Sequence, residues 1–137
     1  MSDRIFIDTN VLIYLYSKEK DKQQIVLSLL ESEHTFWIST HVIMEFCNVL
    51  IKKLKYTRKE VEVALEDFKE NFEIIEVTLG TIEKALTIQE QYRYTFFDSL
   101  VLATALLSNC TQIYSEDMQH NQVIENTLRI RNPFLKE

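Results

Sequence analysis

The chain has 137 residues, a length that predicts one domain spanning residues 1–137. Fifteen Lys and Arg against twenty-one Asp and Glu give a formal charge of −6, which excludes a protein that grips nucleic acid mainly through a broad basic surface. The charge is compatible with an enzyme whose acids bind metal ions and whose substrate is a phosphate. One Gly excludes the phosphate-binding loops that need two or more, and one Gly with one Pro argues against an all-β sandwich.

Three features of the sequence indicate the cellular compartment of the protein. Cys47 and Cys110 lie in apolar stretches without a CxxC spacing, so buried thiols in a reducing cytosol are expected rather than a disulfide or a zinc site. The apolar run 5–16 is interrupted by polar residues and lacks a small-residue cleavage site, so it is not typical of a signal peptide. No stretch of 18 apolar residues is present. The sequence therefore predicts a cytoplasmic protein that does not contact a membrane.

Short β-rich runs alternate along the chain with segments of helical periodicity. Strands are predicted at 4–7, 36–38, 72–77 and 112–114, with a weaker fifth at 128–130. Helices are predicted at 11–16, 21–32, 40–54, 57–68, from Thr78 or Thr81 to about 92, and at 98–107. Thr57 and Glu60 fit a capping box, and the helix at 98–107 is apolar on all sides, which predicts a central position. This order predicts an α/β fold: a mainly parallel sheet covered by helices on both faces.

Four acids occupy positions where a carboxylate is costly. Asp8 follows the first predicted strand and Asp117 follows the fourth by a short turn, and ligands bind at the carboxyl ends of strands in open α/β sheets. Glu45 lies in an apolar stretch of its helix, and Asp98 stands between Phe97 and an apolar helix. Each acid also has a simpler interpretation: Asp8 and Asp98 as helix caps, Asp117 as a turn residue and Glu45 as a surface side chain.

The four acids together favour a shared site. Carboxylates from separated segments that meet in one cleft repel one another and raise their own pKa values. Hard divalent cations relieve this repulsion, because Mg²⁺ takes oxygen ligands and keeps several waters. The reaction that such a site serves is in-line displacement at a phosphate, with the metal activating water and stabilising the leaving oxygen.

Segments that contain these acids resemble the motifs of PIN-domain nucleases. Residues 7–13 (IDTNVLI) are similar to the opening motif, 39–46 (STHVIMEF) to the second, 97–103 (FDSLVLA) to the third and 114–118 (YSEDM) to the fourth, and 132–134 (NPF) is a common ending. Each motif alone is weak, but four in this order and spacing are specific, and they cover essentially the whole chain. For a chain of this size the resemblance is greatest to the VapC-type ribonuclease toxins of bacterial toxin–antitoxin pairs.

The resemblance implies a parallel sheet with helices on both sides and RNA cleavage that depends on Mg²⁺, with Mn²⁺ as a substitute. It implies that Asp8, Glu45, Asp98 and Asp117 form the catalytic site. In this interpretation Asp8 and Asp98 contact the metal, Asp117 binds a second ion, and Glu45 binds directly or through water.

The resemblance also extends to supporting residues and partners. Asn10 and Ser115 match polar positions that orient carboxylates or water. The expected partners are an RNA substrate, a cognate antitoxin with an acidic or Arg-bearing tail, and a second copy of the chain in a homodimer. Some relatives carry another acid after the fourth motif, where this chain has His120 and Asn121, so a second metal is expected to be held less tightly.

Other residues have both a functional and a structural interpretation. His120 either touches substrate phosphate or is a solvated turn residue. A basic run either binds the RNA backbone, with Tyr56 stacking on a base, or is a solvated helix face; it comprises Lys52, Lys53, Lys55, Arg58 and Lys59. Arg93 and Tyr94 either line the approach to the site or belong to the surrounding packing. The aromatic residues considered for a dimer contact, which are equally compatible with the core, are Trp37, Phe72 and Tyr92.

Four other classes of protein are compatible with parts of this pattern. Haloacid dehalogenase-type phosphatases need a second acid two residues after the first, where this chain has Asn10, and receiver domains need paired acids near the first strand and a late lysine. A PIN-like module that binds without cutting is expected to have lost one or more acids, and all four are present. A housekeeping RNA-processing nuclease without an antitoxin fits the same residues and remains open.

Overall fold

A computed structural model describes residues 2–136. Its strands and helices alternate along the chain, as the sequence predicts. In chain order they are β1 (Arg4–Ile7), α1 (Thr9–Leu12), a 3-10 helix η1 (Ile13–Tyr16), α2 (Lys20–Leu30), β2 (Thr35–Ser39), α3 (Thr40–Lys52), α4 (Arg58–Asn71), β3 (Glu73–Ile75), α5 (Leu79–Tyr92), α6 (Phe96–Leu107), β4 (Gln112–Tyr114), β5 (Val123–Ile124) and β6 (Leu128–Arg131).

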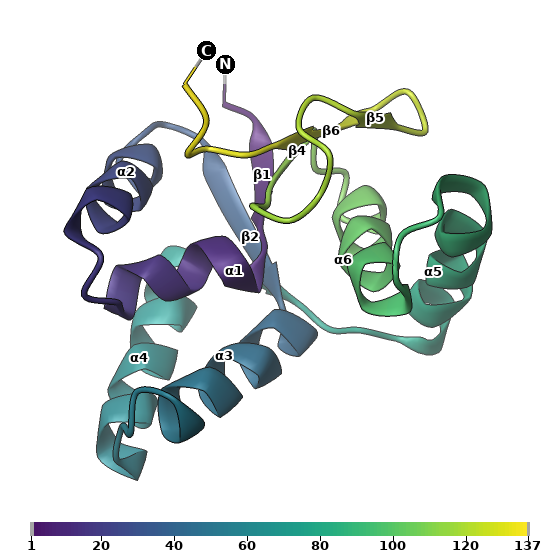
Figure 1. Ribbon diagram of the computed structural model, residues 1–137. Coiled ribbons are helices and arrows are strands. Elements are labelled where there is room, and N and C mark those ends of the chain that lie inside the picture. The colour runs from purple at the N-terminus through teal and green to yellow at the C-terminus, as the bar shows by residue number, and fades with distance from the viewer. Residues whose placement is uncertain (1, 137) are drawn as a thin grey trace.

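These strands form one sheet in the order β3-β2-β1-β4-β6-β5. All neighbouring pairs are parallel except β5 and β6, which are antiparallel. Figure 1 shows α1, α2 and α4 on one side of the strands and α5 beside α6 on the other. The predicted α/β fold, with a mainly parallel sheet between two helical layers, is confirmed.

The position of the functional site follows from the direction of the connections. The chain steps from β1 to β2 to β3 in one direction along the sheet and then returns, through α5 and α6, to place β4 on the other side of β1. Right-handed crossovers put the helices before and after this reversal on opposite faces. The loops that leave β1 and β4 therefore diverge, and the crevice between them is where ligands bind in folds of this kind.

The strands and the helix next to the sheet form the core. Ile5, Phe6 and Ile7 of β1 are fully buried, and seven consecutive residues of α6, 99–105, are buried, which confirms its predicted central position. Cys110 is buried as expected, whereas Cys47 is only half-buried, and neither is in a disulfide. Among residues 2–136 no helix is long and apolar enough to cross a membrane.

Several details differ from the predicted elements: the helix predicted at 11–16 is α1 followed by the 3-10 helix η1, and the strand predicted at 72–77 is limited to β3. The helix expected to open at Asp98 begins at Phe96, because the side chain of Thr95 caps it by accepting a hydrogen bond from the Asp98 backbone N–H at 3.2 Å. The sequence did not predict β5, which has two residues and pairs with β6 through a tight turn. Residues 125–127 join the two strands, and Glu125 and Asn126 have φ of 48° and 63°, the left-handed values that type I′ turns require.

Candidate functional site

One cleft brings together the four acids singled out in the sequence. It has a volume of about 290 Å³ and receives side chains from the start of α1, from α3, from α6 and from the loop after β4. The residues that line it are Asp8, Thr9, Asn10, Ile13, Glu45, Val49, Lys53, Phe97, Asp98, Val101 and Asp117. The cleft lies where β1 and β4 end, at the point where the direction of the connections reverses.

Asp8 forms the buried floor of this cleft. It directly follows β1 and caps α1, because its Oδ1 accepts the Thr9 backbone N–H at 2.8 Å. Its Oδ2 accepts a hydrogen bond from the Ser115 hydroxyl at 2.9 Å. The residue is only 6% exposed, and burial raises the pKa of Asp8 from 3.8 to about 7, against the opposing effect of these two hydrogen bonds. The negative charges of Asp98 and Glu45 raise this pKa further.

Asp98 and Glu45 face the cleft from α6 and α3. Asp98 is the third residue of α6 and not its cap, so the interpretation of this acid as a simple helix cap is wrong. Partial burial raises the pKa of Asp98; the Thr95 hydrogen bond opposes this, and Asp117 and Glu45 add to it. The side chain of Glu45 is 46% exposed and accepts a hydrogen bond from the Thr9 hydroxyl at 2.9 Å. The acids therefore act on one another electrostatically, as members of one cluster do.

Asp117 completes the group from the loop after β4. Asn10 holds it there, since the Asn10 side-chain Nδ2 donates to Asp117 Oδ2 at 3.0 Å. The same Asn10 accepts the Glu116 backbone N–H through Oδ1 at 3.1 Å, so one amide fixes both the loop and the acid. Asn10 and Ser115 thus make the contacts that residues orienting carboxylates would make.

The donor set fits a hard divalent cation. The polar side chains on the cleft are carboxylates, an amide, a hydroxyl and one ammonium, and oxygen ligands of this kind suit Mg²⁺ or Mn²⁺. Within residues 2–136 no three His, Cys, Asp or Glu side chains are close enough to hold an ion among themselves. Mg²⁺ needs no such cage, because it usually keeps several waters and binds one or two carboxylates. Asp8 is buried and makes no ion pair among the described residues, so a bound cation would stabilise its ionised form most.

Glu116, between the two site residues Ser115 and Asp117, ties their loop to the helices after β1. Its Oε2 accepts from Lys22 Nζ at 2.6 Å and its Oε1 accepts from the Tyr14 hydroxyl at 2.8 Å. Lys22 also donates to Tyr14 at 3.1 Å and lies over the ring of Phe134, 5.0 Å from its centroid. We name Tyr14, Lys22 and Glu116 the loop clamp, since they fix the segment that carries Asp117.

A substitution in the loop clamp is expected to lower Mg²⁺-dependent RNA cleavage while the protein still folds. For Lys22→Met we expect about 10-fold slower RNA cleavage and a higher Mg²⁺ concentration at half-maximal rate, since outer contacts of metal ligands contribute 10- to 100-fold. Lys84→Met is the matched control, because the Lys84–Glu125 pair is similarly half-exposed, at 29% and 31% against 35% and 25% for Lys22–Glu116, but lies outside the cleft. An equal Mg²⁺ requirement in both variants would contradict a positioning role.

Several residues considered in the sequence lie elsewhere or have other contacts. His120 is a partly exposed turn residue that accepts the Asn132 backbone N–H at 2.9 Å and so joins the loop after β4 to the end of β6. Tyr94 contacts Gln122 and the Gln119 backbone, and Tyr56 packs edge-on against Tyr16 at 6.4 Å. The residues considered for a dimer contact, Trp37, Phe72 and Tyr92, all pack against the core.

Lys53 is the member of the basic run that lines the cleft. Three other residues, Thr9, Glu116 and Phe97, have contacts or positions at the site that the sequence did not predict. Helical periodicity explains the position of Lys53, which is two turns after Glu45 and on the same side of α3. Thr9 was treated only as part of a motif, although it holds Glu45. The motif at 114–118 assigns no role to Glu116, and Phe97, an apolar residue type, lines the cleft and is 60% exposed.

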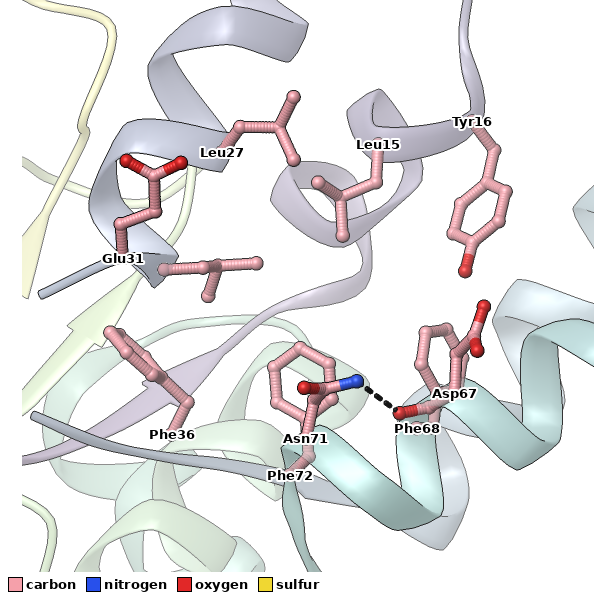
Figure 2. Close-up of a pocket in the computed structure, with 10 residues that line it drawn as sticks. Leu15, Tyr16, Leu27, Glu31, Phe36, Asp67, Phe68, Asn71 and Phe72 are labelled. Atoms are coloured by element: carbon pink, nitrogen blue, oxygen red, sulfur yellow. Dashed lines mark hydrogen bonds between the residues drawn. The ribbon is translucent and has the colours of Figure 1, made fainter.

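A hollow larger than the acidic cleft lies elsewhere on the described part of the protein. A groove of about 410 Å³ lies between η1, α2 and α4, and Figure 2 shows mainly apolar side chains along it. Its two acids, Glu31 and Asp67, come from α2's end and from α4, and the Tyr16 hydroxyl points toward Asp67. Burial and this carboxylate raise the pKa of Tyr16 to about 12. The groove therefore offers apolar surface, whereas the chemistry is concentrated at the acidic cleft.

Known proteins share this fold, and a family model matches the sequence. The family model of the PIN domain matches residues 5–125. VapC20 of Mycobacterium tuberculosis, a sarcin–ricin-loop-cleaving toxin, is 21% identical over 82% of this chain and 89% of its own, with a TM-score of 0.67. A toxin–antitoxin complex from Klebsiella pneumoniae gives 23% identity, 95% and 98% coverage and a TM-score of 0.68.

A third structure, VapBC2 from Rickettsia felis bound to a DNA fragment from their promoter, gives 20% identity, 94% and 99% coverage and a TM-score of 0.67. Comparison with curated proteins gives no match. At these identities the structural likeness shows the fold, while the family model extends over most of the chain.

Proposed function

The chain belongs to the PIN-domain family, and on this basis we propose that it is a Mg²⁺-dependent endoribonuclease that hydrolyses RNA phosphodiester bonds. The observation that carries the proposal is the convergence of Asp8, Glu45, Asp98 and Asp117 on one cleft at the carboxyl ends of β1 and β4. A buried acid whose pKa is raised to about 7, beside other acids, is typical of a functional site.

The side chains divide the work of such a reaction. Asp8 and Asp98 would hold the ion directly, Asp117 would hold a second one, and Glu45 would bind directly or through water. Mg²⁺, with Mn²⁺ as a substitute, supplies a water nucleophile at neutral pH and stabilisation of the leaving oxygen. Asn10 and Ser115 keep the carboxylates of Asp117 and Asp8 in fixed orientations through the hydrogen bonds described above.

Purified protein and a mixed RNA substrate test this proposal. Cleavage is expected with millimolar Mg²⁺ and is expected to stop when EDTA is added. A protein that binds RNA tightly but leaves it intact at all Mg²⁺ or Mn²⁺ concentrations would instead be a non-catalytic PIN-like module.

Lys53 is proposed to contact the RNA backbone. It lies about 12 Å along α3 from Glu45, estimated from the helical rise, and it is the cation that lines the cleft among the described residues. A phosphate next to the reacting one would meet this ammonium group. Because the cleft is otherwise acidic, Lys53 offsets part of the repulsion between RNA and the carboxylates.

Lys53→Ala is expected to weaken RNA binding at low salt and to make binding less dependent on salt. Loss of one phosphate contact to single-stranded RNA lowers the slope of log K against log salt by about 0.7. Lys59→Ala is the control, because Lys59 is exposed on α4 and does not line the cleft. RNA affinity measured at 50 and 200 mM salt separates the two, and identical slopes for both variants would remove Lys53 from the binding site.

We also propose that the protein is the toxin of a toxin–antitoxin pair and forms a homodimer. An antitoxin partner is supported by the similar structure from Klebsiella pneumoniae, which is a toxin–antitoxin complex, and by the similar VapBC2 from Rickettsia felis. An Arg side chain from an antitoxin suits the cleft, because it can pair with two carboxylates in place of the metal. Expression of the chain alone should arrest growth, and an antitoxin should relieve the arrest; harmless expression with no co-purifying protein would favour a housekeeping RNA-processing nuclease.

A further inference from the structure

We infer that the exposed ring of Phe97 is a stacking platform for an RNA base next to the cleaved phosphate. This inference rests on the proposed ribonuclease function and assigns it a nucleobase subsite. It starts from an unusual exposure: Phe97 is 60% exposed, and it is the one Phe, Tyr or Trp classed as exposed among residues 2–136. Leaving an aromatic ring in water forgoes the burial that stabilises other rings of this chain.

The ring lies at the site of the proposed chemistry. Phe97 lines the same cleft as Asp8, Glu45, Asp98 and Asp117. It immediately precedes Asp98 in α6, so their Cα atoms are about 3.8 Å apart. A nucleotide whose phosphate is held at these acids therefore carries its base within reach of the ring.

The ring is also held rigidly from one side. The imidazole of His41 lies parallel to it, with centroids 5.2 Å apart and an interplanar angle of 4°, and Phe96 packs edge-on at 5.5 Å and 73°. The His41 side chain is only 13% exposed, so it forms a fixed backing beneath Phe97. Because Phe97 stays 60% exposed with His41 stacked on it, a base that approaches from the side away from His41 would extend the stack by one ring.

The surroundings favour a nucleobase over an apolar peptide side chain. Carboxylates and Lys53 surround the cleft, and these groups suit a charged phosphodiester with a metal ion rather than an apolar partner. A phenyl ring offers no hydrogen bond to the edge of a base, so the subsite would accept any base by stacking. The other strongly exposed apolar side chains, such as Leu79 at 73%, are aliphatic and lie outside the cleft.

The test compares Phe97→Ala, Phe97→Trp and the control Leu79→Ala on a short RNA with one cleavage site. Phe97→Ala is expected to lower kcat/KM about 10- to 100-fold, mostly through KM, as loss of one base stack does. Phe97→Trp is expected to retain activity, and Leu79→Ala is expected to match wild type. On RNA with an abasic nucleotide at the stacked position, wild type and Phe97→Ala should cleave equally, because the base that distinguishes them is gone.

Three outcomes overturn the inference. In the first, Phe97→Ala cleaves intact RNA as wild type does. In the second, its loss of activity persists on RNAs made abasic on either side of the cleaved bond. In the third, Phe97→Ala changes the oligomeric state measured by light scattering and loses activity equally on every substrate, which would make the ring a protein contact.

A binding measurement separates failure of this inference from failure of the proposed function. RNA with 2-aminopurine at the stacked position is mixed with protein and Mg²⁺, and its fluorescence is recorded before cleavage. Quenching is expected with wild type and Leu79→Ala but not with Phe97→Ala. Equal quenching with Phe97→Ala overturns the stacking platform even where the wild-type enzyme cleaves RNA. Quenching that depends on Phe97 in a protein that never cleaves supports the subsite and rejects the nuclease.

Discussion

RNA cleavage by Asp98→Asn is expected to fall by at least about 100-fold. Removing a residue that only supports a metal ligand costs about 10- to 100-fold, and losing the ligand itself should cost at least as much. An amide keeps the shape of the carboxylate but carries no charge to hold Mg²⁺. Thr95, and not residue 98, caps α6, so the helix should form as in wild type. Initial rates at saturating Mg²⁺, together with a circular dichroism spectrum, measure both effects.

The control for this variant is Glu90→Gln, an equally conservative change at an exposed position of α5. It should cleave RNA as wild type does. Near-wild-type cleavage by Asp98→Asn would mean that this acid is not part of the metal site, whatever its place in the cleft.

The second large effect concerns stability in the absence of metal, where burying the ionised Asp8 is costly. Asp8 has a pKa of 3.8 in the unfolded chain and about 7 in the folded protein. Between these pH values the folded state holds a proton that the unfolded state has lost, so the free energy of unfolding falls as the pH rises through this window. Above about pH 7 the whole cost is present.

Asp8→Asn is therefore expected to be more stable than wild type at pH 8 in EDTA, by up to roughly 4 kcal/mol. Asn is as good a helix cap as Asp, so the bond to the Thr9 N–H can persist. The gain should shrink to less than about 1 kcal/mol near pH 4, where Asp8 is protonated in the folded protein and about half protonated in the unfolded chain. Mg²⁺ should raise the Tm of wild type at pH 8 but not that of the variant. Denaturant titrations at the two pH values check this, and a gain that is the same at both would assign the effect to something other than the charge of Asp8.

Local sequence predicts the parts of the fold and site that neighbouring residues determine, such as strand ends and helix caps. The buried run 4–7 ends in Asp8, which places an acid at a strand end, and Thr57 with Glu60 forms the predicted capping box of α4. The apolar surroundings of Glu45 indicated an acid facing into the structure, and its side chain lines the cleft although it is half-exposed.

The parts that local sequence does not predict depend on distant residues or on weak turn signals. The β5–β6 hairpin turns at Glu125 and Asn126 without a Gly, so the pattern that usually marks such a turn is missing. Lys22 and Glu116 of the loop clamp are 94 residues apart, and only the folded chain brings them together. Phe97 has the residue type of a core position, but it is exposed and stacks on His41, 56 residues earlier in the chain, a contact that no local pattern predicts.

We expect Asp8 and Asp98 to share one divalent ion in the acidic cleft. A crystal of the protein soaked in Mn²⁺, with anomalous scattering recorded at the manganese edge, tests it most directly. We predict an anomalous peak in contact with both carboxylates in wild-type crystals and no peak at that position in Asp98→Asn crystals. Manganese bound only outside the cleft, or an equal peak in the variant, would contradict the account.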